Sequence, residues 1–395
     1  MKLIYQILSI LDKNDKIHFY SLLVLIFISM FLEMLSIGLI VPIITLIINS
    51  DQSFLHSYNI SFLQNFLLMS KEIQIATVLI IFVFVYFFKS IYLTFLTIYL
   101  NSFSYNLKAK LSKNLFKQYL NKKFEFYIDN NSSTLLRNIK DEPDLFVVQV
   151  FKPLLILFVD IFLIIGVVTV LIFYEPLIST LLLVMLTLIG FIFLKLSNKQ
   201  ITLQGMLRQK NDALRIKIIS QAFNSIVEIM ILNVRKTLVG NYIEPNDKSA
   251  KAVKLNTIFQ ELPRVWLEMT GVTGALIITF GMLFLNRDFN EIVPFLGLFS
   301  LAAFKTLPTA NRILASLTSI KFAKPVIRII QKNLPRNFIK DEKINSKKKI
   351  INFKNNITFK NVNFSFYEKK NKKQIFKNLN LKIRKNSSVA IIGES

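Results

Sequence analysis

Six long apolar runs, separated by polar and mostly basic stretches, dominate the pattern of hydrophobic and polar positions along the chain. Each run has about 20 residues or more, the length that an α-helix needs to cross about 30 Å of hydrocarbon. We therefore expect six membrane-spanning helices, at 20–48, 75–100, 145–173, 177–196, 263–285 and 292–316. An amphipathic stretch at 3–18 precedes them and predicts either a short helix on the inner leaflet or a frayed end of the chain.

The polar stretches between the runs differ in charge, and this difference predicts orientation. The two long stretches that follow the second and fourth runs are rich in lysine and arginine, whereas the three on the opposite side carry only Lys71 and Arg287. Because Lys/Arg-rich loops stay in the cytoplasm, we expect both ends of the chain there. The long basic stretches keep a helical pattern, so helices two to five should extend well beyond the membrane.

Two short breaks interrupt these cytoplasmic helices. The first, at 124–133, carries Asp129, Asn130 and Asn131, and the second, near 235–245, begins with Arg235 and Lys236. A plain turn between two helices accounts for either break. A pair of long helices that ends in a short break also suits docking onto a partner domain.

After a charged helix and linker, the pattern changes to the period-two alternation of β-strands. It predicts three strands, at 357–367, 374–383 and 388–393, which begin a soluble domain. The last residues read V-A-I-I-G-E-S. A buried strand followed by Gly393, Glu394 and Ser395 is the start of a phosphate-binding loop, before the second glycine, the lysine and the hydroxyl that such a loop needs.

Composition supports a membrane protein. The chain is 53% hydrophobic, and its formal net charge of +25 lies in stretches that alternate with the apolar runs, so we expect cytoplasmic loops and no nucleic-acid partner. The absence of cysteine excludes disulfides and thiolate sites. The two histidines, His18 and His56, are far apart, and no metal site is expected.

Four charged residues lie near the middle of their apolar runs: Glu33, Lys89, Asp160 and Lys305. A charge at this depth costs several kcal/mol unless it is paired or faces water. One interpretation is that they pair, for example Glu33 with Lys89. The other is that Lys305, together with Asn311 and Arg312, lines a cavity that attracts an anionic head group such as pyrophosphate.

Two stretches near the C-terminus carry a family resemblance. Residues 359–366 (F-K-N-V-N-F-S-F) resemble the opening strand of an ATP-binding cassette (ABC) nucleotide domain, and 378–385 resemble its N-L-x-L-x-I segment, with Asn386 where glycine is usual. With the six runs, the chain resembles an exporter-type ABC transporter half. This resemblance implies an all-α membrane domain of six helices with long cytoplasmic extensions, followed by a truncated β-rich start of an α/β P-loop domain.

The resemblance also implies domains and nucleotide contacts. The domains are an elbow helix (1–19), the membrane domain (20–320), a linker (321–356) and a nucleotide-domain fragment (357–395). ATP and Mg²⁺ are the implied cofactors. Phe366 or Tyr367 would stack on adenine, and Gly393, Glu394 and Ser395 would begin the phosphate loop. Coupling helices would lie within the breaks, at 127–133 and 233–241. The intact parent would be an ATP-hydrolysing translocase, whereas this chain alone, without the loop's lysine, should be inactive.

Within the family, residues 32–42 and 302–313 resemble the lipid-linked oligosaccharide flippase branch. That branch implies an amphipathic lipid-linked substrate, alternating access, a second transporter half in a homodimer, and the bacterial inner membrane. Two alternatives remain open. One is a generic ABC exporter of lipid, polysaccharide or peptide, and the other is a secondary transporter or channel with a basic tail.

Overall fold

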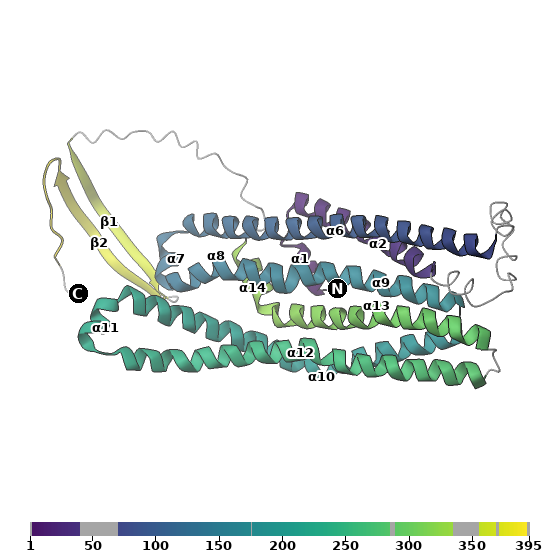
Figure 1. Cartoon of the computed structure of the whole chain (residues 1–395). Coiled ribbons are helices and arrows are strands. Elements are labelled where there is room, and N and C mark those ends of the chain that lie inside the picture. Colours follow the sequence, from purple (N-terminus) through teal and green to yellow (C-terminus); the bar gives the residue numbers. More distant parts are fainter. Residues whose placement is uncertain are drawn as a thin grey trace.

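The computed structural model describes residues 2–39, 70–174, 176–284, 289–334, 355–368 and 371–392. These residues form a bundle of long helices with a β-hairpin beside one end (Figure 1). The predicted outer loop at 52–71 lies almost entirely outside the described residues, as do Gly393, Glu394 and Ser395.

Long α-helices account for most of the described chain. In order, the helices are α1 (Lys2–Leu8), α2 (Lys13–Gly38), α6 (Lys71–Leu120), α7 (Phe124–Asp129), α8 (Ser132–Phe146), the π-helix η1 (Val147–Phe151), α9 (Lys152–Tyr174), α10 (Pro176–Asn224), α11 (Ile226–Leu232), α12 (Arg235–Phe284), α13 (Phe289–Phe322) and α14 (Lys324–Asn333).

Five of the described helical stretches are long and apolar enough to cross a membrane, so the chain has the helices of a membrane protein. They are Lys13–Ser36, Glu72–Leu120, Ser132–Phe173, Leu183–Asn224 and Arg235–Phe284. The sixth predicted run lies in α13, which has 34 residues and packs against α9 and α12.

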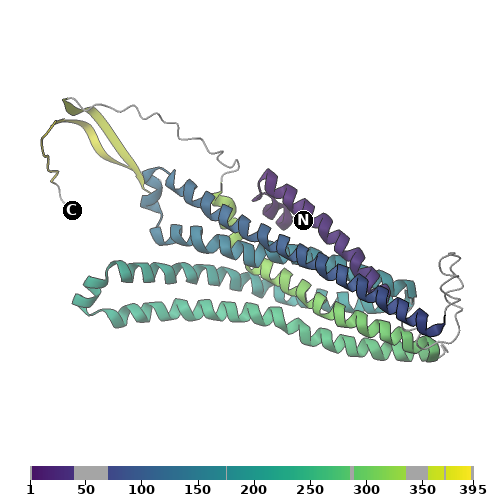
Figure 2. The same cartoon turned by 45° about the horizontal axis from the view of Figure 1, so that its top comes forward.

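Three helices are much longer than a membrane is thick. The helices α6, α10 and α12 have 49 or 50 residues, which corresponds to about 75 Å at 1.5 Å per residue. All three extend past the end of α13 toward the side where α7 and α11 lie (Figures 1 and 2). The predicted extension of the helices beyond their apolar runs is therefore confirmed.

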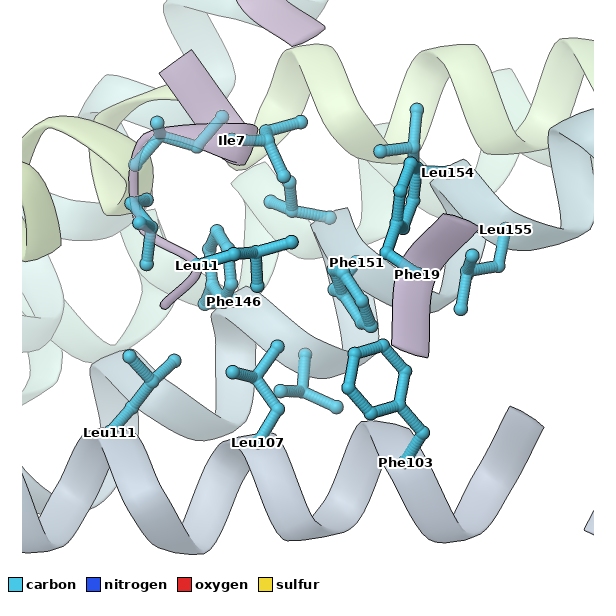
Figure 3. Close-up of a cluster of buried hydrophobic side chains, with 14 of the residues drawn as sticks. Ile7, Leu11, Phe19, Phe103, Leu107, Leu111, Phe146, Phe151, Leu154 and Leu155 are labelled. Atoms are coloured by element: carbon cyan, nitrogen blue, oxygen red, sulfur yellow. The ribbon is translucent and has the colours of Figure 1, made fainter. Parts of the chain in front are cut away.

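The main hydrophobic core joins the N-terminal segment to the bundle. Figure 3 shows Ile7 and Leu11 facing side chains of α6 and of the segment from α8 to α9. Ile10 is also buried there. The apolar side of the stretch at 3–18 is therefore covered by protein, and the stretch consists of α1, a turn and the start of α2.

The predicted linker begins with a packed helix. In α14, Val326, Ile327 and Ile330 are buried in the same core as α1. Gln331 on α14 donates hydrogen bonds from Nε2 to the carbonyl oxygen of Gln6 (2.8 Å) and to Ser9 Oγ (2.9 Å). The N-terminal segment thus holds the start of the stretch at 321–356, and residues 335–354 lie outside the described part.

Two of the three predicted strands are confirmed. Strands β1 (Asn356–Glu368) and β2 (Asn371–Arg384) form an antiparallel pair, and β1 contacts α7. The third prediction is wrong in its described part, because 388–392 pairs with neither strand and Ile391 and Ile392 are exposed. An apolar run becomes a strand only where a neighbouring strand takes its hydrogen bonds and a core covers its side chains.

Candidate functional site

Three charged side chains meet between α2, α6 and α13. Glu33 accepts hydrogen bonds from two lysines: Lys89 Nζ lies 2.6 Å from its Oε2, and Lys305 Nζ contacts its Oε1. Glu33 and Lys89 are buried, whereas the Lys305 side chain is 29% exposed. Glu33 and Lys305 are 272 residues apart in the sequence, and the packing of the bundle brings their side chains into contact.

Two neutral side chains complete this cluster. Lys89 donates a hydrogen bond to Ser36 Oγ (2.8 Å), and Ser36 donates to the carbonyl oxygen of Glu33 (2.8 Å). The Tyr86 ring centroid lies 4.9 Å from Lys89 Nζ and 5.8 Å from Lys305 Nζ. An aromatic face attracts cations electrostatically, so Tyr86 helps to hold both ammonium groups.

The charges of the cluster do not cancel. One carboxylate faces two ammonium groups, which leaves one positive charge in surplus where a charge is costly. Lys305 is the partly exposed member of the cluster, so a ligand can approach the surplus positive charge through its side chain. The cluster can therefore attract an anion without exposing Glu33 or Lys89.

A second ion pair joins α9 to α13. Arg312 Nη2 donates to Asp160 Oδ1 (2.7 Å), and its Nε lies 3.1 and 3.2 Å from the two carboxylate oxygens. Asp160 is 1% exposed, but the Arg312 side chain is 52% exposed. Thr309 supports the pair, since its hydroxyl accepts from Arg312 Nη2 (3.2 Å) and donates to the Lys305 carbonyl oxygen (2.7 Å).

Lys305 and Arg312 lie on one side of α13, because a spacing of seven residues is about two helical turns. Asn311 precedes Arg312 in α13, and its buried Oδ1 has no hydrogen-bond partner among the described residues. The arrangement is a row of two part-exposed cations, each held by a buried carboxylate. Such a row can bind an extended anion such as a phosphate or pyrophosphate ester.

The predicted pairing of Glu33 with Lys89 is confirmed. The sequence did not indicate that Lys305 shares the same carboxylate, or that Asp160 pairs with Arg312. Ser36, Tyr86 and Thr309 were also missed as members of the site. The signal for Ser36 was its position three residues after Glu33, on the same helical face.

A separate polar cluster lies between α8 and the part of α10 beyond its apolar run. Glu142 is buried 3.3 Å from Arg137 Nε, beside a cavity of about 370 Å³ that Arg208 and Asp212 also line. Burial raises the pKa of Glu142 above its usual value, although Arg137 and Arg208 act to lower it. No motif in the sequence indicated this cluster, in which Arg137 of α8 donates to the Gln209 carbonyl oxygen of α10.

The nucleotide-contact predictions fall at the edge of the described chain. Phe366 and Tyr367 lie near the end of β1, where they pair with Lys373 and Lys372. No group of three or more histidine, aspartate or glutamate side chains that could hold a metal ion occurs among the described residues.

The first predicted break is confirmed. The short helix α7 ends at Asp129, and the chain turns through Asn130 and Asn131 into α8. Asn131 caps α8, since its Oδ1 accepts the backbone N–H of Ser133 at 3.1 Å. This turn lies at the end of the bundle that faces β1 (Figure 1).

The second predicted break, near 235–245, is wrong in position, and the range 233–241 includes only the last residues of the actual turn. The chain turns earlier, at 225–234, where Asn233 has the left-handed φ of 50°. Arg235 and Lys236 begin α12, which continues through Pro245 and Pro263. A proline costs a long helix one hydrogen bond, and the buried contacts along α12 outweigh that loss.

No protein-family model matches the chain. Its function is therefore inferred from the charges and packing of the site itself.

Proposed function

We propose that the chain is one half of an ATP-driven ABC exporter that moves an amphipathic lipid with an anionic head group. A lipid-linked oligosaccharide or polysaccharide precursor, joined through pyrophosphate, fits this description. The observation that carries the proposal is the row of Lys305 and Arg312 on α13, each paired with a buried carboxylate and each partly exposed.

The ion pairs explain how Lys305 and Arg312 can stay charged within apolar runs when no substrate is bound. Glu33 and Asp160 compensate the charges of Lys305 and Arg312 when no substrate is bound, which lowers the cost of holding them within apolar runs. A phosphate oxygen offers the same charge-assisted hydrogen bonds as a carboxylate. An arriving head group can therefore share the two cations with their carboxylates, and the surplus positive charge favours its entry.

The long helices support the link to ATP. The turn at α7 and the turn at α11 lie at one end of the bundle (Figure 1). Lys89 of the charged cluster lies about 47 Å along α6 from the end that leads into α7. In our proposal, two copies assemble, ATP with Mg²⁺ binds between two nucleotide domains, and the two turns transmit their closure to the helices. The membrane half then alternates between inward-open and outward-open states in the bacterial inner membrane.

Binding of the head group can be tested on the purified chain in lipid nanodiscs. We expect undecaprenyl pyrophosphate to bind, and Lys305→Ala or Arg312→Ala to weaken binding about tenfold or more, the effect of losing a hydrogen bond to a charged group. Lys248→Ala is the matched control, because Lys248 is exposed and pairs only locally with Glu244 on α12. Unchanged affinity in both site variants would exclude the head-group role.

ATP coupling needs a separate measurement on the transporter with a complete nucleotide domain. In proteoliposomes, we expect the same lipid to stimulate ATP hydrolysis and its own transport to require ATP. Lys248→Ala should keep both properties. Transport that proceeds without ATP would instead favour a secondary transporter or channel.

A further inference from the structure

The long helix that runs from α8 to α9 changes its hydrogen bonding at η1. The N–H of Lys152 donates there to the Val147 carbonyl oxygen, five residues earlier instead of four. Pro153 follows, and it has no N–H for the Gln149 carbonyl oxygen, its partner in a regular α-helix. Ser319 of α13 donates to that oxygen instead, at 3.0 Å. A helix whose regular hydrogen bonds are interrupted can bend at the interruption.

The side chains at η1 would move little in such a bend. Val147, Val150 and Phe151 are fully buried in the main hydrophobic core. Displacement grows with distance from a pivot, and α8 extends about 22 Å from η1 to its first residue. The core can therefore stay packed while the far end of α8 changes position.

The cavity of about 370 Å³ between α8 and α10 leaves room for a movement of α8 toward α10. In the observed position, α8 is tied to α6. Asn138 Nδ2 donates to the Tyr119 hydroxyl (3.0 Å), and Lys108 Nζ contacts Asp144 Oδ1. These contacts with α6 oppose closure of the cavity.

The two walls of this cavity carry opposite net charge. The α8 wall has three carboxylates and one guanidinium, whereas the α10 wall has two guanidiniums and one carboxylate. The charged residues are Arg137, Asp141, Glu142 and Asp144 on α8, and Arg208, Asp212 and Arg215 on α10. Opposite charges attract, so electrostatics favours the approach of the two walls.

Two of these side chains are left without a hydrogen bond. Arg208 is buried, but it donates no hydrogen bond to a described residue, and its Nε lies 3.7 Å from Asp212 Oδ2 on the same helix. On the opposite wall, no described residue donates a hydrogen bond to Asp141. A charge withdrawn from water is costly unless it is paired and hydrogen-bonded. A position of α8 that joins Arg208 to Asp141 would lower this cost.

We propose that η1 is a hinge, about which α8 swings toward α10 until the cavity closes and Arg208 donates to Asp141. In the open position, Ser319 and the contacts with α6 hold α8 away from α10. The α7 turn, at the far end of α8, moves furthest. This movement requires no particular substrate, so it does not rest on the transport proposal.

Spin labels on two introduced cysteines measure the movement in the purified full chain, which has no cysteine of its own. Ser132→Cys on α8 and Lys217→Cys on α10 are at exposed positions. An approach of about 2 Å at Asp141, which is about 9 Å from η1, becomes about 5 Å at Ser132. Double electron–electron resonance should therefore show two distances about 5 Å apart, the shorter one from the closed position.

Two substitutions should change the ratio of these distances. Ser319→Ala removes the hydrogen bond at η1, and Lys108→Ala removes a contact with α6. Each should raise the short-distance population about fivefold, the effect of one lost hydrogen bond. The Lys108 side chain is part-exposed, so Lys108→Ala keeps the test valid if Ser319→Ala folds poorly. Ser300→Ala is the matched control, because the Ser300 hydroxyl donates to the Leu296 carbonyl oxygen of its own helix.

Asp141→Asn tests the charge that closes the cavity. Added to either variant, it should lower the short-distance population about tenfold, because a hydrogen bond between two charged groups is lost. If Ser319→Ala and Lys108→Ala give the same distances as Ser300→Ala, the hinge is excluded. A short distance that persists undiminished with Asp141→Asn would overturn the pairing with Arg208.

Discussion

At the scale of single residues, the sharing of Glu33 by two lysines makes the three side chains unequal. Without Lys89, Glu33 and Lys305 remain as a neutral pair. Without Glu33, two ammonium groups remain near each other in an apolar region with no carboxylate between them. The stability of the helix packing should therefore depend far more on the carboxylate than on Lys89.

We expect Glu33→Gln to lower the free energy of unfolding by about 3–5 kcal/mol, the range for removing one partner of a buried ion pair. Lys89→Met should cost less, and the double variant should be more stable than Glu33→Gln alone. Thermal unfolding in detergent measures all three. Strictly additive effects of the two substitutions would show that the side chains do not interact.

A close backbone contact at Gly205 gives a second residue-scale prediction. A Cβ atom there would lie 2.0 Å from the carbonyl oxygen of Phe322, at the junction of α13 and α14. Gly205→Ala must move α10 away from this junction, and we expect a loss of about 1–3 kcal/mol. In contrast, Gly240→Ala enters open space within α12 and should stabilise by up to about 1 kcal/mol. Comparable melting temperatures for the two variants would contradict this contact.

At the scale of elements, local sequence patterns predicted whether a segment is a helix or a strand better than they predicted where it begins and ends. The apolar runs indicated helices correctly, because the hydrophobic character of a run of about 20 residues can be read from that segment alone. The burial of α14 could not be seen in the same way, because it depends on α1, more than 300 residues earlier. Likewise, Pro245 suggested a break, but α12 continues through it because contacts along the whole helix stabilise it. The partners of Lys305 and Asp160 also depend on neighbouring helices rather than on nearby residues.

The cap of α8 is an element-scale feature with a measurable contribution. Asn131→Ala removes the acceptor for the Ser133 N–H, and we expect it to destabilise the first turn of α8 by about 1 kcal/mol. Asn131→Asp retains the acceptor and serves as the control. Hydrogen exchange of the amides at the start of α8 reports the effect. Faster exchange in both variants alike would mean that the cap does not hold this turn.

At the scale of the whole molecule, the distribution of lysine and arginine predicts the orientation of the chain in the membrane. Because the chain has no cysteine, single cysteines can be introduced without a background. Asn130→Cys lies at the turn after α7, and Phe173→Cys lies near the opposite end of the helix formed by α8 to α9. With a membrane-impermeant maleimide, we expect the first to react only from the cytoplasmic side and the second only from outside. Labelling of both from one side would contradict the orientation.

The contact at Gly205 also has a mechanical consequence for α10. It divides this rod into arms of about 44 Å toward Pro176 and about 29 Å toward Asn224. If α10 pivots there as a rigid body, the two ends move in opposite directions, and the far end travels about 1.5 times as far as the end next to α11. Gly205 would thus be the pivot point of α10. Its position along the helix would set the ratio between the displacements of the two helix ends.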